Sequence, residues 1–409
     1  MSIRVLVVDD SGFFRRRIRA MIEQDSRLEV CGEAADGRQA IEQARRLCPD
    51  VITMDIEMPE LDGISAVREI VRYRPTPVLM FSSLTHEGAR ATIEALEAGA
   101  SDFIPKRFAD VSGDMEAVQR QLCERLVELG GGRRGGGARR GQAAASQSEP
   151  SPRGDEGSTP AARSTTGAAA DSGRQQRTTP ERGGGEAPRD AGRHPSGRGE
   201  AGASAAETPA RRTTARGPRL ADLEAVVIGC STGGPVALQR VLTKLSARFP
   251  VPVLVVQHMP ASFTPAFAER LNELCAVTVR EARDDDVLRP GEVLLAPGGR
   301  HIGIRGRSGH LSVYTYEGPS DHHYKPSVDI AFSEMARLVP GRVLGIVLTG
   351  MGSDGAKGAK LLKESGSWVW SQDEASSVIY GMPAAVAKAG LSDQVLPLDQ
   401  IGDELSRLR

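Results

Sequence analysis

The sequence predicts an α/β protein of two doubly wound parallel-sheet domains joined by a long disordered linker. Short apolar runs alternate with helical patterns in residues 1–129 and again in residues 218–409, as in repeated βα units. Residues 130–217 contain no Ile, Leu, Val, Met, Phe, Tyr, Trp or Cys. Because such a stretch cannot bury enough apolar surface to offset its ordering entropy, we expect it to be disordered.

The formal net charge of −1 is the sum of three segments that differ in charge. Residues 1–129 hold 17 basic and 23 acidic side chains, residues 130–217 hold 15 and 9, and residues 218–409 hold 20 and 21. The near-neutral last segment argues against a DNA-binding output domain, which would present a basic face. The arginines of the middle segment could bind an acidic partner, but a solvated spacer is the favoured interpretation.

Cysteine usage and hydropathy predict a cytoplasmic protein. The five cysteines are odd in number and scattered without a CxxC pair, so neither a disulfide framework nor a zinc site is indicated. No apolar run approaches the roughly 20 residues of a membrane span, and two aspartates follow the first apolar run too soon for a signal peptide. We expect no membrane insertion and no nucleic-acid partner, and a monomer is the default.

In the first domain, polar side chains follow the apolar runs. Asp9 and Asp10 end the run IRVLVVDD, Asp55 lies in DVITMDIEMP, Ser82 follows the fourth run and Lys106 the fifth. The domain closes with a helical pattern from residue 115 to 129. Ligands of parallel sheets gather beyond the carboxyl ends of the strands, where converging carboxylates favour Mg²⁺. A carboxylate, a cation, a hydroxyl and a lysine together suit phosphoryl transfer, although each aspartate could simply start a loop or cap a helix.

Residues 1–129 resemble the receiver domain of bacterial two-component response regulators, through VVDDS, DIEMPELDG, the serine pair and the late lysine. The resemblance implies a flavodoxin-like fold and a histidine kinase as phosphodonor. Receivers usually have Pro after the lysine, whereas Arg107 follows it here. The implied site residues are the phosphoryl acceptor Asp55, the phosphate contacts Ser82 and Lys106, and the Mg²⁺ ligands Asp9, Asp10, Asp55 and the backbone carbonyl of Glu57.

The second domain opens with an apolar strand that ends in small, turn-forming residues. Gly229, Ser231 and Gly233 fit G-x-S-x-G, and a helical pattern begins near Pro235. A serine on a sharp strand-to-helix turn presents its hydroxyl above the sheet. A glycine-rich turn before a helix also suits phosphate binding, but the absence of G-x-G-x-x-G disfavours a dinucleotide site.

A nucleophilic serine needs a base and an orienting carboxylate. His258 ends the run VPVLVVQH, and Asp354 lies in MGSDG beyond the run VLGIVLTG. We therefore expect both at the same sheet edge as Ser231; a structural histidine and a helix-capping aspartate are the alternatives. The chain order Ser, His, Asp matches none of three well-known serine hydrolase orders, so those folds are not implied.

Residues 223–396 resemble the catalytic domain of CheB-type protein-glutamate methylesterases of bacterial chemotaxis. The matching segments are GCSTGGP, QHMPASFTPAFAERLN, PSVD, LTGMGSDG and QDEASSVIYGMP. The resemblance implies a Rossmann-like domain without a cofactor. It further implies the nucleophile Ser231, the general base and acid His258, the orienting Asp354, and an oxyanion hole from the backbone N–H groups of Thr232 and Met351.

Together the two resemblances predict a phosphorylation-regulated serine hydrolase. It would remove methyl esters from glutamate side chains on the cytoplasmic helices of chemoreceptors and deamidate receptor glutamines. In this hypothesis the unphosphorylated receiver covers the catalytic entrance and phosphorylation favours the open state. Two alternatives stay open at this point: a catalytically silent response regulator that acts by protein binding, and a small-molecule esterase.

Overall fold

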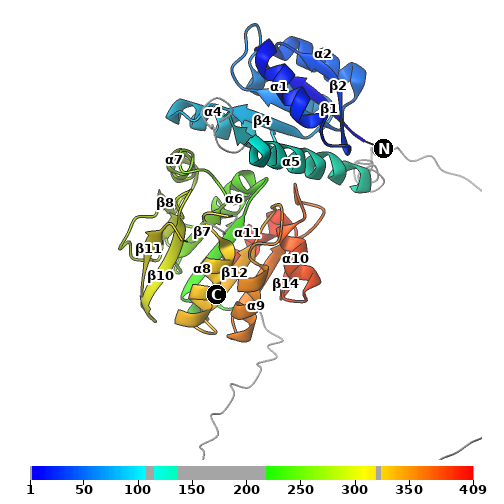
Figure 1. Cartoon of the computed structure of the whole chain (residues 1–409). Coiled ribbons are helices and arrows are strands. Elements are labelled where there is room, and N and C mark those ends of the chain that lie inside the picture. Colours follow the sequence, from blue (N-terminus) through cyan, green and yellow to red (C-terminus); the bar gives the residue numbers. More distant parts are fainter. Residues whose placement is uncertain (1, 107–114, 137–217, 319–323, 409) are drawn as a thin grey trace, which may run out of the picture. The chain divides into compact units, whose positions relative to one another are not determined.

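The computed structural model describes residues 2–106, 115–136, 218–318 and 324–408. Within these ranges the chain forms two parallel α/β domains (Figure 1), which confirms the predicted fold class. Arg107 and most of the predicted linker lie outside the described residues. None of the described helices is both long and apolar enough to cross a membrane.

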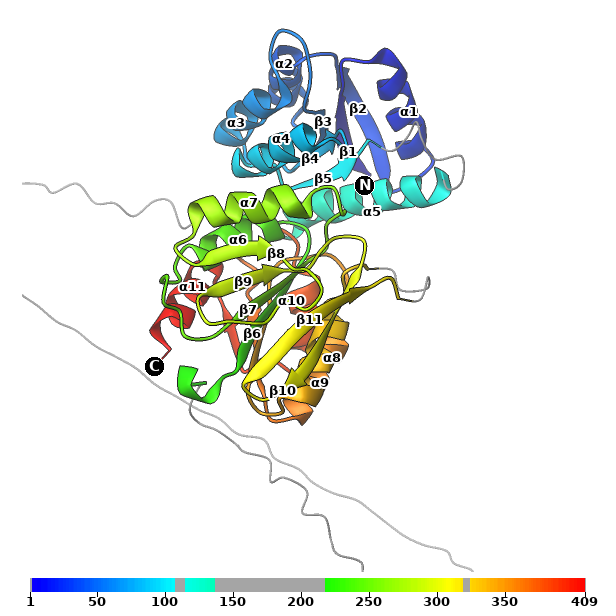
Figure 2. The same cartoon turned by 90° about the vertical axis from the view of Figure 1, so that its left-hand side faces the viewer.

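The first domain has a five-stranded parallel sheet in the order β2-β1-β3-β4-β5. This is the flavodoxin-like order that the resemblance implied. Helices α2, α3 and α4 lie on one face and α1 and α5 on the other (Figure 2). The strands are β1 Ile3–Val8, β2 Leu28–Ala34, β3 Val51–Asp55, β4 Val78–Ser82 and β5 Asp102–Pro105, and the helices are α1 Gly12–Ile22, α2 Gly37–Leu47, α3 Gly63–Tyr73, α4 His86–Glu97 and α5 Met115–Gly136.

Local sequence explains where these elements begin and end. Every residue of β3 and β4 is buried, because helices cover both faces of the sheet. Side chains of Asp36, Asp62 and Thr85 accept a backbone N–H at the starts of α2, α3 and α4. Helix α5 runs to Gly136, seven residues beyond the domain boundary predicted at residue 129.

The second domain has a seven-stranded parallel sheet in the order β14-β13-β12-β6-β7-β9-β8, plus an antiparallel hairpin of β10 and β11. The strands are β6 Ala225–Cys230, β7 Val253–Gln257, β8 Thr278–Glu281, β9 Glu292–Leu295, β10 His301–Arg307, β11 His310–Tyr316, β12 Val343–Val347, β13 Trp368–Gln372 and β14 Gln394–Leu396.

Helices cover both faces of this sheet, and the hairpin packs beside α8 (Figures 1 and 2). Helices α6, α7 and α11 form one layer, and α8, α9 and α10 form the other. The helices are the short 3₁₀ turn η1 Leu220–Asp222, α6 Gly234–Leu242, α7 Thr264–Leu274, α8 Val328–Leu338, α9 Ala356–Glu364, α10 Met382–Lys388 and α11 Leu398–Arg407.

The strand order of this sheet reverses beside β6. The chain passes from β6 to β7 on one side and later places β12 on the other side of β6. The carboxyl ends of strands at such a switch point border a crevice, which is where doubly wound sheets bind their ligands. Ser231 directly follows β6, His258 directly follows β7, and Asp354 lies seven residues beyond β12.

Candidate phosphorylation and hydrolytic sites

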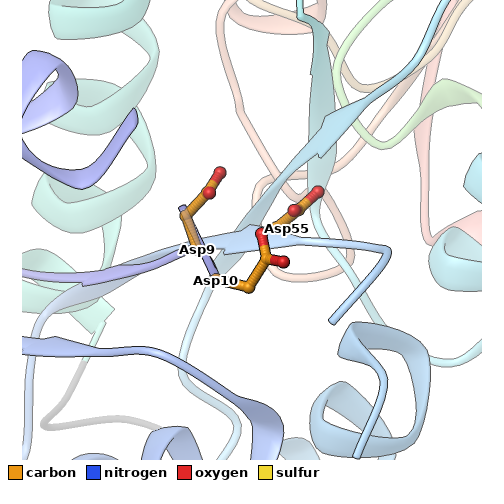
Figure 3. Close-up of side chains that lie close together, drawn as sticks. All are labelled: Asp9, Asp10 and Asp55. Carbon is orange, nitrogen blue, oxygen red and sulfur yellow. The ribbon is translucent and has the colours of Figure 1, made fainter. Parts of the chain in front are cut away.

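Three carboxylates meet at the carboxyl edge of the five-stranded sheet (Figure 3). One oxygen from each of Asp9, Asp10 and Asp55 lies within 4.8 Å of the others. Asp9 and Asp55 are buried, whereas Asp10 is exposed and lines an open hollow together with Glu57. This set of hard oxygen ligands with an open side fits a divalent cation that keeps bound water. The structure therefore brings together three of the four residues predicted as metal ligands, and Glu57 lines the hollow beside Asp10.

Lys106 closes the other side of this cluster. Its Nζ lies 2.7 Å from Oδ2 of Asp55 and 3.0 Å from Oδ2 of Asp9. Burial raises the pKa of Asp55 to about 6, despite the opposing effect of the lysine charge. The ammonium group thus lies where it can contact an acceptor carboxylate and any phosphoryl group attached to it.

Ser82 lies at the same edge, but its hydroxyl is directed toward helix α4. Ser82 Oγ is 3.1 Å from the carbonyl oxygens of both Gly88 and Ser83, and it accepts a hydrogen bond from Thr92. A phosphoryl oxygen on Asp55 would have to compete with these carbonyls for the Ser82 proton. The predicted phosphate contact by Ser82 therefore requires this hydroxyl to reorient.

The raised pKa of Asp55 leads to a pH-dependent stability prediction. Asp55→Asn replaces a buried carboxyl group by an uncharged amide. The pKa of this carboxyl is about 6 in the folded protein, above its ordinary value of 3.8. The stability that Asp55 contributes is therefore full below pH 3.8 and is lost as the pH rises through 6. With EDTA present to remove divalent cations, we compare the free energies of unfolding of Asp55→Asn and the parent protein. We expect the variant to be more stable than the parent by near zero at pH 4 and by about 1–3 kcal/mol at pH 8.

Urea denaturation measures this difference, and Asp62→Asn is the control with the opposite sign. Burial alone would raise the pKa of Asp62, but hydrogen bonds from Ser65 lower it below the ordinary value. The stability that the Asp62 carboxylate contributes is therefore lost as the pH falls. Asp62→Asn should therefore cost more stability at pH 8 than at pH 4. An Asp55→Asn effect that does not change with pH would contradict the prediction.

In the second domain, His258 and Asp354 form a buried pair. Nε2 of His258 lies 2.7 Å from Oδ2 of Asp354, and both side chains are less than 10% exposed. Because a carboxylate only accepts, Nε2 carries the proton and Nδ1 is the free base nitrogen. Nδ1 is buried and has no hydrogen-bond partner among the described residues. The ring of Tyr324 stacks on the imidazole, with centroids 4.4 Å apart and planes 8° from parallel.

Ser231 lies beside this pair at the same sheet edge. Its N–H donates to the carbonyl of Thr349, and its own carbonyl accepts from Gly234. A Cβ added to Gly350 would lie only 2.8 Å from Cβ of Ser231, so the loop after β12 passes directly against the serine. No hydrogen bond joins Ser231 to His258 within the described part of the chain; such catalytic contacts are often long without substrate.

The two backbone amides predicted to bind an oxyanion belong to residues that directly follow Ser231 and Gly350, and Gly350 packs against the serine. Thr232 follows it, and Met351 follows the closely packed Gly350. Neither amide donates a hydrogen bond to any residue that the structure describes. Both are therefore free to donate to a substrate oxygen.

The carboxylate of Asp354 is held by five donors, some of which the sequence analysis did not assign. Oδ2 accepts from His258 and from the amide of Val328 at 2.7 Å; Oδ1 accepts from the Ser327 hydroxyl at 3.0 Å and from the amides of Asp329 and Gly355 at 2.9 and 3.1 Å. Burial alone would raise the pKa of Asp354, but these hydrogen bonds lower it. The only sequence signal for this network was the matching segment PSVD, because its backbone contacts leave no pattern of their own.

This network predicts a measurable role for Ser327. Ser327→Ala removes one of the five donors to the Asp354 carboxylate; because the other four remain, we expect kcat to fall by roughly 3- to 30-fold, equivalent to about 0.7–2 kcal/mol. Ser333→Ala is the matched control, because that hydroxyl bonds only the Asp329 carbonyl in the same helix. The two variants are compared by steady-state kinetics, and equal effects would show that Asp354 does not depend on the Ser327 hydroxyl.

Comparison with known proteins places both domains in described families. Residues 5–114 match the response regulator receiver domain, and residues 226–405 match the CheB methylesterase domain. The chain is 60% identical over 414 residues to a protein-glutamate methylesterase/protein-glutamine glutaminase of Alkalilimnicola ehrlichii, with 100% of both chains covered. It is 49% identical over 405 residues to a protein of the same description from Pseudomonas savastanoi pv. phaseolicola, with 99% of each covered.

Two solved structures from Thermotoga maritima are also similar. The CheB methylesterase catalytic domain is 37% identical, with a TM-score of 0.44, and the match covers 46% of this chain and 99% of that one. The CheB response regulator domain is 50% identical, with a TM-score of 0.29, and the match covers 31% of this chain and 94% of that one.

Proposed function

The chain belongs to the family of CheB-type protein-glutamate methylesterases/protein-glutamine glutaminases, and we propose that Ser231, His258 and Asp354 carry out its hydrolytic reaction. The enzyme acts in chemotaxis adaptation and is regulated by its receiver domain. The family membership confirms the activity predicted from the sequence and displaces the two alternatives. The observation that best supports the residue roles is the buried His258–Asp354 hydrogen bond beside Ser231 at the switch point of the sheet.

In the first half-reaction, Ser231 Oγ attacks the carbonyl carbon of a glutamyl methyl ester while Nδ1 of His258 takes the hydroxyl proton. Asp354 holds the proton on Nε2 and stabilises the imidazolium that forms. The amides of Thr232 and Met351 stabilise the tetrahedral oxyanion. When the intermediate collapses, the C–O bond to methanol breaks and Nδ1 returns the proton to the leaving methoxide oxygen. A glutaminyl substrate releases ammonia in the same way.

In the second half-reaction, water replaces methanol. Nδ1 removes a proton from water as its oxygen attacks the acyl-enzyme, and the same proton then returns to Ser231 Oγ as the ester bond breaks. The product is a glutamate side chain. Here the carboxylate bonds Nε2, whereas in the familiar serine protease triad it bonds Nδ1, so the two ring nitrogens exchange roles.

Ser231→Ala should abolish methanol release, because no other group can form the acyl-enzyme. Asp354→Asn should lower kcat by about 10²- to 10⁴-fold, because it no longer selects the productive tautomer. Methanol released from methyl-labelled receptor measures both. Ser246→Ala, on an exposed serine of the same domain, is the control. Full activity of Ser231→Ala would exclude this serine as the nucleophile.

For the receiver domain, we propose Asp55 as the acceptor of a phosphoryl group from a histidine kinase. Asp9, Asp10, Asp55 and the Glu57 carbonyl would hold Mg²⁺, which when bound would offset negative charge on the transferring group. Lys106 is positioned to contact the phosphoryl group, and Ser82 would do so after its hydroxyl turns. The proposed substrates are methylated glutamates on chemoreceptor cytoplasmic helices, and the proposed location is the cytoplasm.

Asp55→Asn should lose the increase in esterase rate that a small phosphodonor produces in the parent enzyme, since an amide cannot accept the phosphoryl group. The ratio of rates with and without the phosphodonor measures this effect. EDTA should abolish the same increase in the parent if a divalent cation is required. An undiminished ratio for Asp55→Asn would rule out Asp55 as the acceptor.

A further inference from the structure

The side chain of Gln257 connects the ends of the two strands that carry Ser231 and His258. Its Nε2 donates to the carbonyl oxygen of Ser231 and to that of His258, both at 3.1 Å. Its Oε1 accepts a hydrogen bond from the thiol of Cys230 at 3.0 Å. Gln257 is 2% exposed and Cys230 is fully buried. All the hydrogen-bonding groups of this amide are thus satisfied inside the domain.

We infer that Gln257 is a positioning residue that sets the nucleophile against the base, and that the Cys230 thiol fixes the orientation of its amide. This inference rests on the proposed roles of Ser231 and His258. Neither Gln257 nor Cys230 touches the reacting atoms in this account. They act through the backbone of the residues that do.

Strand register explains why a side chain is needed at this place. Cys230 and Gln257 are the last paired residues of β6 and β7, and the amide of His258 still donates to the carbonyl of Cys230. Ser231 and His258 are the next residue on each strand, beyond the ladder. The Gln257 amide links the carbonyls of these two residues, so it extends the connection between the strands by one residue.

The surroundings allow only one orientation of the amide. Turning it by 180° would set Oε1 against two carbonyl oxygens and leave Nε2 facing the thiol. A buried oxygen left unpaired costs free energy, so the Cys230 donor stabilises the bridging orientation. Burial raises the pKa of the Cys230 thiol, which therefore keeps its proton. A Cβ on Gly234 would overlap Oε1, so glycine at this position leaves room for the amide.

The test uses five variants of the full chain: Gln257→Met, Cys230→Ala, Cys230→Ser, Val255→Ala and Ser231→Ala. Gln257→Met keeps the size of the side chain but removes both donors. Cys230→Ser retains a donor for Oε1, and Cys230→Ala does not. Val255→Ala truncates a buried core side chain of the same strand and controls for a simple loss of stability. Melting temperature, kcat, KM and the rate of serine labelling by a fluorophosphonate are measured for each.

We expect Gln257→Met to lower kcat and the labelling rate by roughly 10- to 100-fold with little change in KM, because small misplacements of reacting groups have effects of this size. Val255→Ala should lower the melting temperature while kcat stays near the parent value. Cys230→Ala should lower kcat less than Gln257→Met, and Cys230→Ser should restore it. The Cys230 pair tests the bridge even if Gln257→Met fails to fold.

Parent-like kcat and labelling in Gln257→Met would overturn the inference, as would equal rates for Cys230→Ala and Cys230→Ser. Ser231→Ala separates this failure from failure of the proposed function. If Ser231→Ala is inactive while Gln257→Met is fully active, only the positioning role is wrong. If Ser231→Ala retains activity, the nucleophile assignment is wrong, and the positioning role falls with it.

Discussion

A single hydrogen bond, between Nε2 of His258 and the carboxylate of Asp354, organises the proposed hydrolytic site. It joins the ends of two strands that lie on opposite sides of β6. By fixing the proton on Nε2, it leaves Nδ1 unprotonated, as the proposed role of His258 as the base for Ser231 requires. The bond persists in a buried setting because Asp354 is satisfied by four further donors, which keep it charged without leaving an oxygen unpaired.

Asp55 and Asp354, two of the buried carboxylates beyond strand ends, show how surroundings shift the pKa of the same group in opposite directions. Asp354 accepts several backbone and side-chain donors, and its pKa is lowered despite burial. Asp55 accepts one backbone amide and faces Lys106, and its pKa is raised to about 6. A permanently charged carboxylate suits the orientation of an imidazole. A carboxylate whose burial is poorly compensated is suited to binding a cation or a phosphoryl group.

Both domains apply the same rule of parallel-sheet architecture. Strands that are buried on both faces must be apolar along their length, so polar side chains appear where each strand ends. Those ends converge at one edge, and side chains far apart in the chain meet there. In the second domain, Cys230 and Gln257 are the last paired residues of β6 and β7. The Gln257 amide extends the connection between these strands by one residue, to Ser231 and His258. Ser231 and His258 directly follow paired strand residues, whereas Asp354 lies in the loop after β12 and is held there by its hydrogen bonds.

The sequence by itself determined the two α/β domains, the acidic cluster and the candidates Ser231, His258 and Asp354. These could be predicted because buried strands read as apolar runs and each candidate follows such a run. Only the tertiary structure decided which imidazole nitrogen faces Asp354, where the Ser82 hydroxyl points, and that Gln257 links the two strand ends. These features depend on hydrogen bonds between residues far apart in the chain, whose directions have no periodic signature. Folding favours them because most buried polar groups must find a hydrogen-bond partner, and Nδ1 of His258 is an exception among the described residues.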